Sequence, residues 1–201
     1  MPTIRPYQPK DAECVHIVSM RTGPKEALET EGPARTLLFA TYVDYYIEHE
    51  PHNCFVIADE EDNAVGYIFC ARDYRPYREI FLREYAPRTK GFSLPMRIEC
   101  LGSVYLPGFF YKKYPAHLHI DILPEVQRMG LGTRLMDALT AHLREQGVRG
   151  VMLGVGSKNE KGKNFYRKYG FQQIGRVPFS IAMGLELAPS NPPESPRTSP
   201  R

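Results

Sequence analysis

The chain has 201 residues and a formal net charge of +3 at pH 7. This length is sufficient for one domain with a hydrophobic core, and the small positive charge suits an anionic ligand, so we expect no nucleic-acid partner. The sequence contains no run of about 18 apolar residues and no signal-peptide core, so we expect a cytoplasmic protein without a membrane span.

The cysteines give no sign of a metal site or of a disulfide framework. No two of them form a CxxC pair, and their spacing matches no zinc-binding pattern. We therefore expect no bound metal, and we expect the thiols to be small buried groups in a reducing compartment. The four residues are Cys14, Cys54, Cys70 and Cys100.

The N-terminal part predicts a strand, two helical regions and a β-hairpin. Residues 3–7 predict the strand, and Asp11 is the candidate N-cap of the helix that follows. A second helical pattern spans residues 34–50. Residues 53–58 and 64–71 are rich in β-branched and aromatic side chains and are separated by a polar turn, so they predict the hairpin.

Residues 72–116 form a long connection that is rich in arginine and tyrosine. We expect a short helix at 78–85 and irregular chain at 102–107 and 109–114. Such long connections are usually functional or disordered, and the aromatic content argues against disorder. Two interpretations stay open: a cover over a ligand site, or a lid that extends the core or makes a dimer contact.

Residues 117–133 predict a strand, a glycine-containing loop and the start of an amphipathic helix. Pro124 ends the strand because it cannot donate a ladder hydrogen bond. The loop contains Gly130 and Gly132. Alternation along the strand places three polar residues on one face and three apolar ones on the other, namely His117, His119 and Asp121 opposite Leu118, Ile120 and Ile122.

The beginning of that helix predicts an anion site. The first backbone N–H groups of a helix have no partner within it and lie at the positive end of its dipole. The two glycines let a bulky anion approach the backbone, so the predicted ligand is a phosphate or a pyrophosphate. The usual nucleotide-binding glycine patterns are absent from this loop.

The C-terminal part predicts one more strand, a helix and a final strand pair. The strand spans residues 150–155, the helix 157–169, and the pair 171–175 and 179–187. Residues 188–201 are rich in proline and serine, so we expect a disordered tail.

Two motifs resemble those of the GCN5-related N-acetyltransferase (GNAT) superfamily. Gln127-x-x-Gly130-x-Gly132 resembles its (Q/R)-x-x-G-x-(G/A) pyrophosphate loop. Asn159-x-x-Gly162-x-x-x-Tyr166-x-x-x-Gly170-Phe171 resembles its N-x-x-(A/G)-x-x-x-Y-x-x-x-G-F segment. The resemblance implies the GNAT fold, an α/β fold with a mixed sheet of about seven strands flanked by about four helices. It also implies one domain over residues 1–187, with residues 72–116 as an insertion.

The resemblance implies acetyl-CoA as co-substrate. In the family, the pantetheine arm lies beside the strand before the loop, and backbone amides of the loop hold the pyrophosphate. Arg128, Lys161 and Lys163 are candidates for the phosphates on the adenosine side, or else form a solvated basic face. The implied binding residues are Ile122, Leu123, Gln127, Arg128, Met129, Gly130, Leu131, Gly132, Thr133, Asn159, Gly162, Lys163 and Tyr166.

The implied chemistry is the attack of an amine on a thioester. An alkylammonium with a pKa near ~10.4 must first lose a proton, so a base or a water chain is needed. His119 and Asp121 are the candidates for this step, although this face of the strand could also be merely solvated. Tyr166 is the candidate donor to the departing thiolate.

Two functions therefore stay open. One is an N-acetyltransferase that acts on a small or protein amine, as a monomer or a homodimer. The other is an acyl-CoA-binding module without catalysis. The string HLHIDILPE followed by GLGTRLM also resembles, more loosely, the acetyltransferase-like C-terminal domain of O-GlcNAc hydrolases, some of which are thought not to acetylate anything. The sequence does not identify the acceptor amine.

Overall fold

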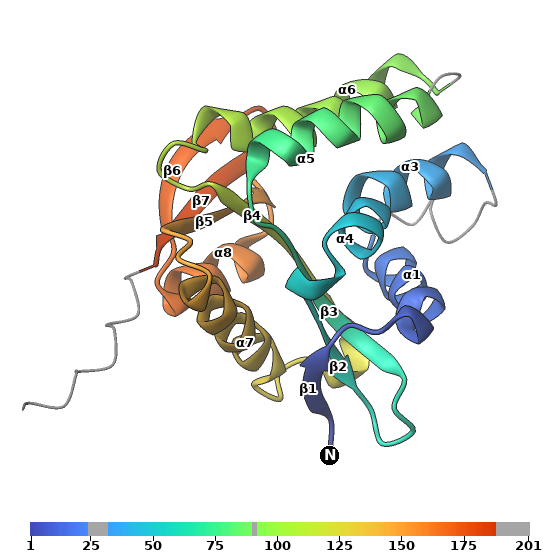
Figure 1. The fold of residues 1–201 in the computed structure, drawn as a ribbon, viewed down its shortest axis with the longest axis vertical. Coiled ribbons are helices and arrows are strands. Elements are labelled where there is room, and N and C mark those ends of the chain that lie inside the picture. Colours follow the sequence, from blue (N-terminus) through green and yellow to red (C-terminus); the bar gives the residue numbers. More distant parts are fainter. Residues whose placement is uncertain (24–31, 90–91, 188–201) are drawn as a thin grey trace, which may run out of the picture.

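The centre of the structure, a computed structural model that describes residues 1–23, 32–89 and 92–187, is a mixed sheet of seven strands. The strand order is β1-β2-β3-β4-β5-β7-β6, and all neighbours are antiparallel except β4 and β5 (Figure 1). The predicted α/β fold is confirmed. The strands are β1 (Thr3–Pro6), β2 (Cys54–Ala58), β3 (Ala64–Ala71), β4 (Ala116–Ile122), β5 (Gly150–Gly156), β6 (Gln172–Val177) and β7 (Ser180–Glu186).

Helices cover both faces of this sheet. In Figure 1, α7 and α8 lie on one side, α1, α3 and α4 on the other, and α5 and α6 run across one end. The seven α-helices of the described residues exceed the expected four, because the second helical region is divided at Val43 and the insertion is itself helical. They are α1 (Ala12–Thr22), α3 (Pro33–Tyr42), α4 (Asp44–His49), α5 (Tyr74–Ile80), α6 (Leu94–Tyr105), α7 (Leu131–Glu145) and α8 (Glu160–Tyr169).

The insertion is more regular than its sequence indicated. Asp73 caps α5 by accepting a hydrogen bond from the Arg75 N–H, and the helix continues as a π-helical turn over Phe81–Tyr85. Helix α6 runs through Gly102, where irregular chain was expected.

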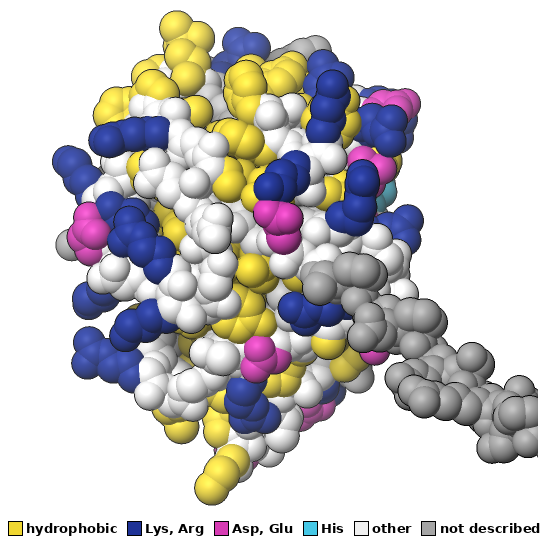
Figure 2. Space-filling model, turned by 90° about the vertical axis from the view of Figure 1, so that its left-hand side faces the viewer, with side chains coloured by type: hydrophobic (Ala, Val, Ile, Leu, Met, Phe, Trp, Pro, Cys, Tyr) yellow, Lys and Arg dark blue, Asp and Glu magenta, His cyan; other side chains and the backbone are white. Residues whose placement is uncertain are grey.

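The two faces of α6 differ in burial. Cys100 and Val104 are buried, so the insertion does extend the core. Hydrophobic side chains also gather at the top of Figure 2, over the end of the molecule that carries α5 and α6. The most exposed large apolar residues of α6 and the turn after it are Leu94, Ile98, Tyr105 and Phe109.

Each face of the sheet has its own hydrophobic core. Leu118 of β4 packs with Leu135 of α7, as the predicted alternation requires. On the opposite face, the ring of His119 lies edge-on to that of Tyr46 of α4, with centroids 5.3 Å apart. The polar strip of β4 therefore faces α1, α3 and α4, and the apolar strip faces α7.

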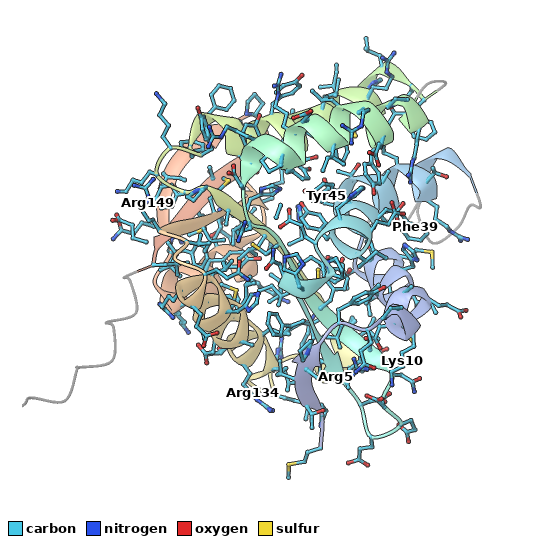
Figure 3. The ribbon with its side chains drawn as sticks, in the orientation of Figure 1. Arg5, Lys10, Phe39, Tyr45, Arg134 and Arg149 are labelled. Atoms are coloured by element: carbon cyan, nitrogen blue, oxygen red, sulfur yellow. The ribbon has the colours of Figure 1, made fainter. Side chains whose placement is uncertain are left out.

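A partly buried ion pair joins the first strand to the turn before α1. Both terminal nitrogens of Arg5 donate to the carboxylate of Asp11, at 2.7 and 2.8 Å, and the Gln8 N–H donates to it at 2.8 Å. Asp11 therefore does not cap α1 with its side chain, as predicted, because Arg5 and Gln8 already occupy the carboxylate. Arg5 and Lys10 lie close together near the β2–β3 turn (Figure 3), where both pair with Asp62.

Two further expectations concern a membrane span and the C-terminal tail. None of the helices within the described residues is long and apolar enough to cross a membrane. The predicted tail, residues 188–201, lies outside the described residues.

The Arg5–Asp11 pair predicts a measurable contribution to stability. Burial opposes the charge of Asp11, but hydrogen bonds from Arg5 and Gln8 outweigh it and lower the pKa of this carboxyl. Asp11→Asn should therefore reduce the free energy of unfolding at pH 7 by about 2 kcal/mol, because a partly buried guanidinium loses the more buried of its two carboxylate partners.

Urea unfolding at several pH values checks this expectation. Since the folded-state pKa is lowered, the difference from the parent protein should narrow as the pH falls through the acidic range. Asp62→Asn is the matched control, because its carboxylate also pairs with Arg5 but is exposed, and its effect should be smaller. Equal effects of the two variants would contradict the assignment.

Candidate active site

The site is built where two parallel strands pair incompletely. β4 and β5 share only the register pairs Ala116–Val151 and His117–Met152. Beyond these pairs, β4 continues alongside β3 and β5 continues alongside β7. The two strands diverge, and each turns toward the other an edge without a strand partner.

A cavity of about 730 Å³ lies between the diverging strands. Residues 118–121 of β4 form one wall and residues 153–156 of β5 another, and α1, α3, α6 and the start of α8 contribute the rest. Four predicted site residues line this cavity together: His119, Asp121, Asn159 and Tyr166. They come from elements far apart in the sequence, so the fold gathers the polar groups around one space.

The predicted phosphate loop connects β4 to α7. Arg128 and Gly130 adopt left-handed backbone conformations, with φ of 66° and 76°, and Gly130 directly precedes the helix. Met129 between them is 58% exposed. The first-turn N–H groups of the helix have no partner within it, so they are available to an anion. These groups belong to Leu131, Gly132 and Thr133.

Basic side chains are frequent on one side of the molecule. Figure 2, which views the left-hand side of Figure 1, shows Lys and Arg spread over this face and fewer Asp and Glu. Arg128 and Lys161, two of the predicted phosphate contacts, are exposed. This charge distribution favours the approach of an anionic ligand.

The end of β4 is fastened by its own neighbours. The side-chain amide of Gln127 donates to the Ile122 carbonyl at 2.8 Å, so Gln127 holds the loop against the strand. The Leu123 N–H donates to the Val65 carbonyl at 3.0 Å, and the Leu123 carbonyl accepts from Val126. Of the two predicted pantetheine contacts, Leu123 has both backbone groups engaged. Strand alternation leaves the N–H of Ile122 on the open edge, while its carbonyl already accepts from Gln127.

Two glycines that were expected to leave room for a ligand leave room for neighbouring side chains. A Cβ on Gly132 would lie 3.3 Å from the ring of Phe165, so this glycine lets α7 approach α8. A Cβ on Gly162 would lie 2.8 Å from the Asn159 amide nitrogen, so this glycine accommodates the helix cap. As predicted, Asn159 caps α8, accepting from the Gly162 N–H at 2.9 Å.

Lys163 has an internal role in the structure. Its ammonium donates to the Ser157 carbonyl and to the Glu160 carboxylate, both at 2.6 Å. It therefore stabilises the turn between β5 and α8, and the Glu160 carboxylate balances its charge. The expectation that this ammonium contacts a phosphate does not match this geometry.

Asp121 has the chemically most distinctive environment in the cavity. Burial raises its pKa to about 6, although the nearby hydroxyl groups of Tyr67 and Thr22 favour the carboxylate. The Tyr67 hydroxyl donates to Asp121 at 2.7 Å. Burial also raises the pKa of Tyr166, and the charge of Asp121 adds to this effect. A carboxylate that titrates near neutrality therefore shares the cavity with a phenol that keeps its proton.

The two histidines of β4 are both neutral at pH 7. Burial lowers the pKa of His119 to about 4, and its ring packs edge-on to that of Tyr42 at 5.0 Å. His117 is only 3% exposed, and burial and the nearby His119 lower its pKa. His117 is not among the described residues that line the cavity.

Part of the cavity wall was not predicted at the level of residues. Thr41 and Tyr42 reach the cavity from α3, and Cys100 reaches it from α6 within the insertion. No local sequence pattern signals them, because their position depends on how these helices pack on β4. The interpretation of the insertion as a cover over the site is supported by Cys100.

Comparison with known proteins is consistent with this geometry. A family model described as "Acetyltransferase (GNAT) family" matches residues 15–171. A mycothiol acetyltransferase from Paenarthrobacter aurescens (strain TC1) is 42% identical over 52 residues, which are 26% of this chain and 16% of that protein. The chain therefore matches only a small part of that relative's length.

Solved structures share the fold over nearly the whole chain. The crystal structure of SsHAT has a TM-score of 0.80 and 29% identity, covering 93% of this chain and 98% of that chain. The PaiA N-acetyltransferase from Thermoplasma acidophilum, solved in complex with coenzyme A, has a TM-score of 0.60 and 14% identity, covering 92% and 99%. The second match shows the fold alone.

The loop geometry predicts that Gly130→Val weakens the binding of CoA. A β-branched residue at this φ costs about 1–2 kcal/mol, and relief of that strain turns the first-turn N–H groups away from the anion. Isothermal titration calorimetry should show a Kd for CoA raised by at least about tenfold.

The matched control is Gly147→Val, at the opposite end of α7. Gly147 has a φ of 71° and open space around its Cβ position, as Gly130 has, so the backbone strain is comparable. Circular dichroism should show both variants folded, and only the first should lose affinity. An equal loss of affinity in both would indicate general destabilisation and contradict the role of the loop.

Proposed function

Because the chain belongs to the GNAT acetyltransferase family, we propose that it transfers an acetyl group from acetyl-CoA directly to a primary amine. The observation that carries this proposal is the cavity between β4 and β5, which has Asp121 on one side and Tyr166 on the other. A base on a strand and a donor on a helix that line one space suit a reaction that takes a proton from a nucleophile and stabilises a leaving group.

The chain has a suitable place for the pantetheine arm and for the pyrophosphate of acetyl-CoA. The open edges of β4 and β5 offer backbone groups to the amides of an extended pantetheine arm, in the manner of an added strand. The loop and the first turn of α7 offer backbone N–H groups to the pyrophosphate. This arrangement would direct the thioester toward the polar face of β4.

We assign the base to Asp121 rather than to His119. With a pKa of about 6, Asp121 is ionised at pH 7 yet is more basic than an ordinary carboxylate. His119, with a pKa of about 4, is a weaker base than the sequence alone suggested. Asp121 would take a proton from the bound ammonium, directly or through one water.

The reaction then balances without a further reactant. The amine nitrogen forms a bond to the thioester carbonyl carbon, and the carbon–sulfur bond breaks. One proton of the original ammonium goes to Asp121, and the nitrogen loses its second proton as the tetrahedral adduct collapses. This second proton passes to the departing sulfur, directly or through water, so that CoA is released as the thiol. The thiolate leaves against the hydroxyl of Tyr166, which stabilises it by a hydrogen bond and stays protonated because its pKa is raised.

Tyr166→Phe should lower kcat by about 10- to 100-fold, because the departing thiolate loses a hydrogen-bond donor. The KM for acetyl-CoA should change much less. Steady-state release of the CoA thiol on a pool of primary amines measures both parameters.

Tyr169→Phe is the control on the same helix. Its hydroxyl donates to Asp137 of α7 at 2.8 Å and lies outside the cavity, so kcat should be close to that of the parent protein. An unchanged kcat in Tyr166→Phe would remove this hydroxyl from the mechanism. Binding of CoA without turnover of any amine would instead indicate a non-catalytic acyl-CoA-binding module.

The pKa of Asp121 predicts the acidic limb of the pH profile. kcat/KM for the amine should rise about tenfold per pH unit below the pKa of about 6 and then level off as Asp121 becomes ionised. Asp121→Asn should abolish this limb and lower the rate by about 100-fold. His119→Gln should retain the limb.

The opposite pattern would assign the base to His119: the acidic limb of the pH profile would survive in Asp121→Asn and disappear in His119→Gln.

The melting temperature shows whether Asp121→Asn is still folded. Since burial raises the folded-state pKa of Asp121, its charge destabilises the fold once the pH exceeds the ordinary value near ~4, and Asp121→Asn should raise the Tm at pH 7.

A further inference from the structure

The cavity has two chemically different parts. The wall formed by β5 and the start of α8, with Asn159 and Tyr166, is the part that would face acetyl-CoA. The other part lies between β4 and helices α1, α3 and α6. In the proposed function, this second part is the space left for the acceptor.

The charge on the acceptor side is strongly one-sided. Among the described residues that line the cavity, Asp121 is the only carboxylate, and no lysine or arginine is present. A substrate carboxylate placed here would meet a like charge and no compensating cation, at a high desolvation cost. A substrate ammonium would meet its counter-charge. The pocket therefore discriminates by charge.

The wall between the polar groups is apolar. Leu37 and Leu38 of α3 and Cys100 of α6 line this part of the cavity. These side chains suit a chain of methylene groups, which gains free energy on leaving water.

One polar group in this apolar wall has no partner. The hydroxyl of Thr41 is buried, the residue is 1% exposed, and the hydroxyl makes no hydrogen bond within the described part of the chain. A helical threonine can satisfy itself on the carbonyl one turn earlier, but this one does not. An unsatisfied buried hydroxyl costs about 1–3 kcal/mol, and a group on a ligand in the cavity would recover part of that cost.

We infer that the acceptor is an unbranched aliphatic primary amine that carries no carboxylate on the part of the molecule inside the cavity, and that Thr41 selects a hydrogen-bonding group further along its chain. This inference rests on the proposed function. Asp121 receives the ammonium, the apolar wall receives the methylenes, and the Thr41 hydroxyl meets a second amine, a hydroxyl or an amide. Two sources share this chemistry: a free diamine or amino alcohol, and the side chain of a lysine residue.

A matched series of four-carbon amines tests the charge selection. We expect kcat/KM for 1,4-diaminobutane, 4-amino-1-butanol and butylamine to exceed that for 4-aminobutyrate by at least about tenfold, because a single unfavourable charge contact costs this much or more. Equal or better use of 4-aminobutyrate would overturn the inference. Measuring kcat/KM for Nα-acetyl-lysine amide at the same concentration distinguishes the two sources. A higher value than for the free amines indicates a lysine side chain, and a lower value indicates a free diamine or amino alcohol.

Thr41→Val tests the hydroxyl, because it exchanges the hydroxyl for a methyl group of similar size. The KM for the diamine and the amino alcohol should rise about three- to tenfold, while the KM values for butylamine and acetyl-CoA stay unchanged. The Tm of the free protein should rise, since a buried unsatisfied group is removed. A lower Tm, or an equal effect on all three amines, would show that Thr41 only supports the fold.

Binding measurements separate failure of this inference from failure of the proposed function. Calorimetry in the presence of CoA should show 1,4-diaminobutane binding and 4-aminobutyrate not binding, and Asp121→Asn should reduce that difference. Selective binding without turnover would retain the pocket assignment and overturn the acetyltransferase activity. Turnover without selectivity would retain the activity and overturn the pocket assignment.

Discussion

The structure depends on one constraint: two parallel strands in the middle of the sheet share only two register pairs. Backbone N–H and C=O groups inside a protein need partners, and an interrupted ladder leaves such groups along two facing edges. Here the interruption creates a cavity instead of a defect, because each strand keeps its other neighbour through its full length. The open edges and the helix cap that follows β5 meet at this space, and the loop that follows β4 leads from it into α7. The proposed function uses the edges and the loop.

Burial, more than residue type, determines which groups can act. His119 and Asp121 lie two positions apart on the same face of β4, and burial shifts their pKa values in opposite directions because their charged forms have opposite signs. The imidazole becomes too weak a base, whereas the carboxylate moves toward neutrality. The sequence pointed to both residues and their ordinary pKa values favoured the histidine, whereas the pKa values in the folded protein favour the carboxylate.

Local patterns, together with two motifs that resemble a known family, were sufficient for the α/β fold and for most of the elements that line the cavity. Alternation marked the two faces of β4, and the glycine-containing loop and the Asn159 cap follow from the backbone preferences of one or two residues. The functions of other residues depend on tertiary packing and could not be inferred locally. Gly162 accommodates its own helix cap, and Lys163 bonds a carbonyl six residues away in sequence. The insertion appeared irregular because π-helical and 3₁₀ turns interrupt its periodicity.

The origins of the cavity walls have a consequence for how such a protein can change. The donor side is built from β5, α8 and its cap, and most of the acceptor side from α1, α3 and α6. Helices α1 and α3 lie across the sheet from α7, and α6 runs across one end (Figure 1). Only β4, with Asp121, belongs to both. The preference for an amine can therefore change through substitutions in three helices without altering the residues that would hold acetyl-CoA. One of these helices, α6 with Cys100, belongs to the insertion. In such a protein, one wall of the cavity can change to fit a new acceptor while the other wall stays the same.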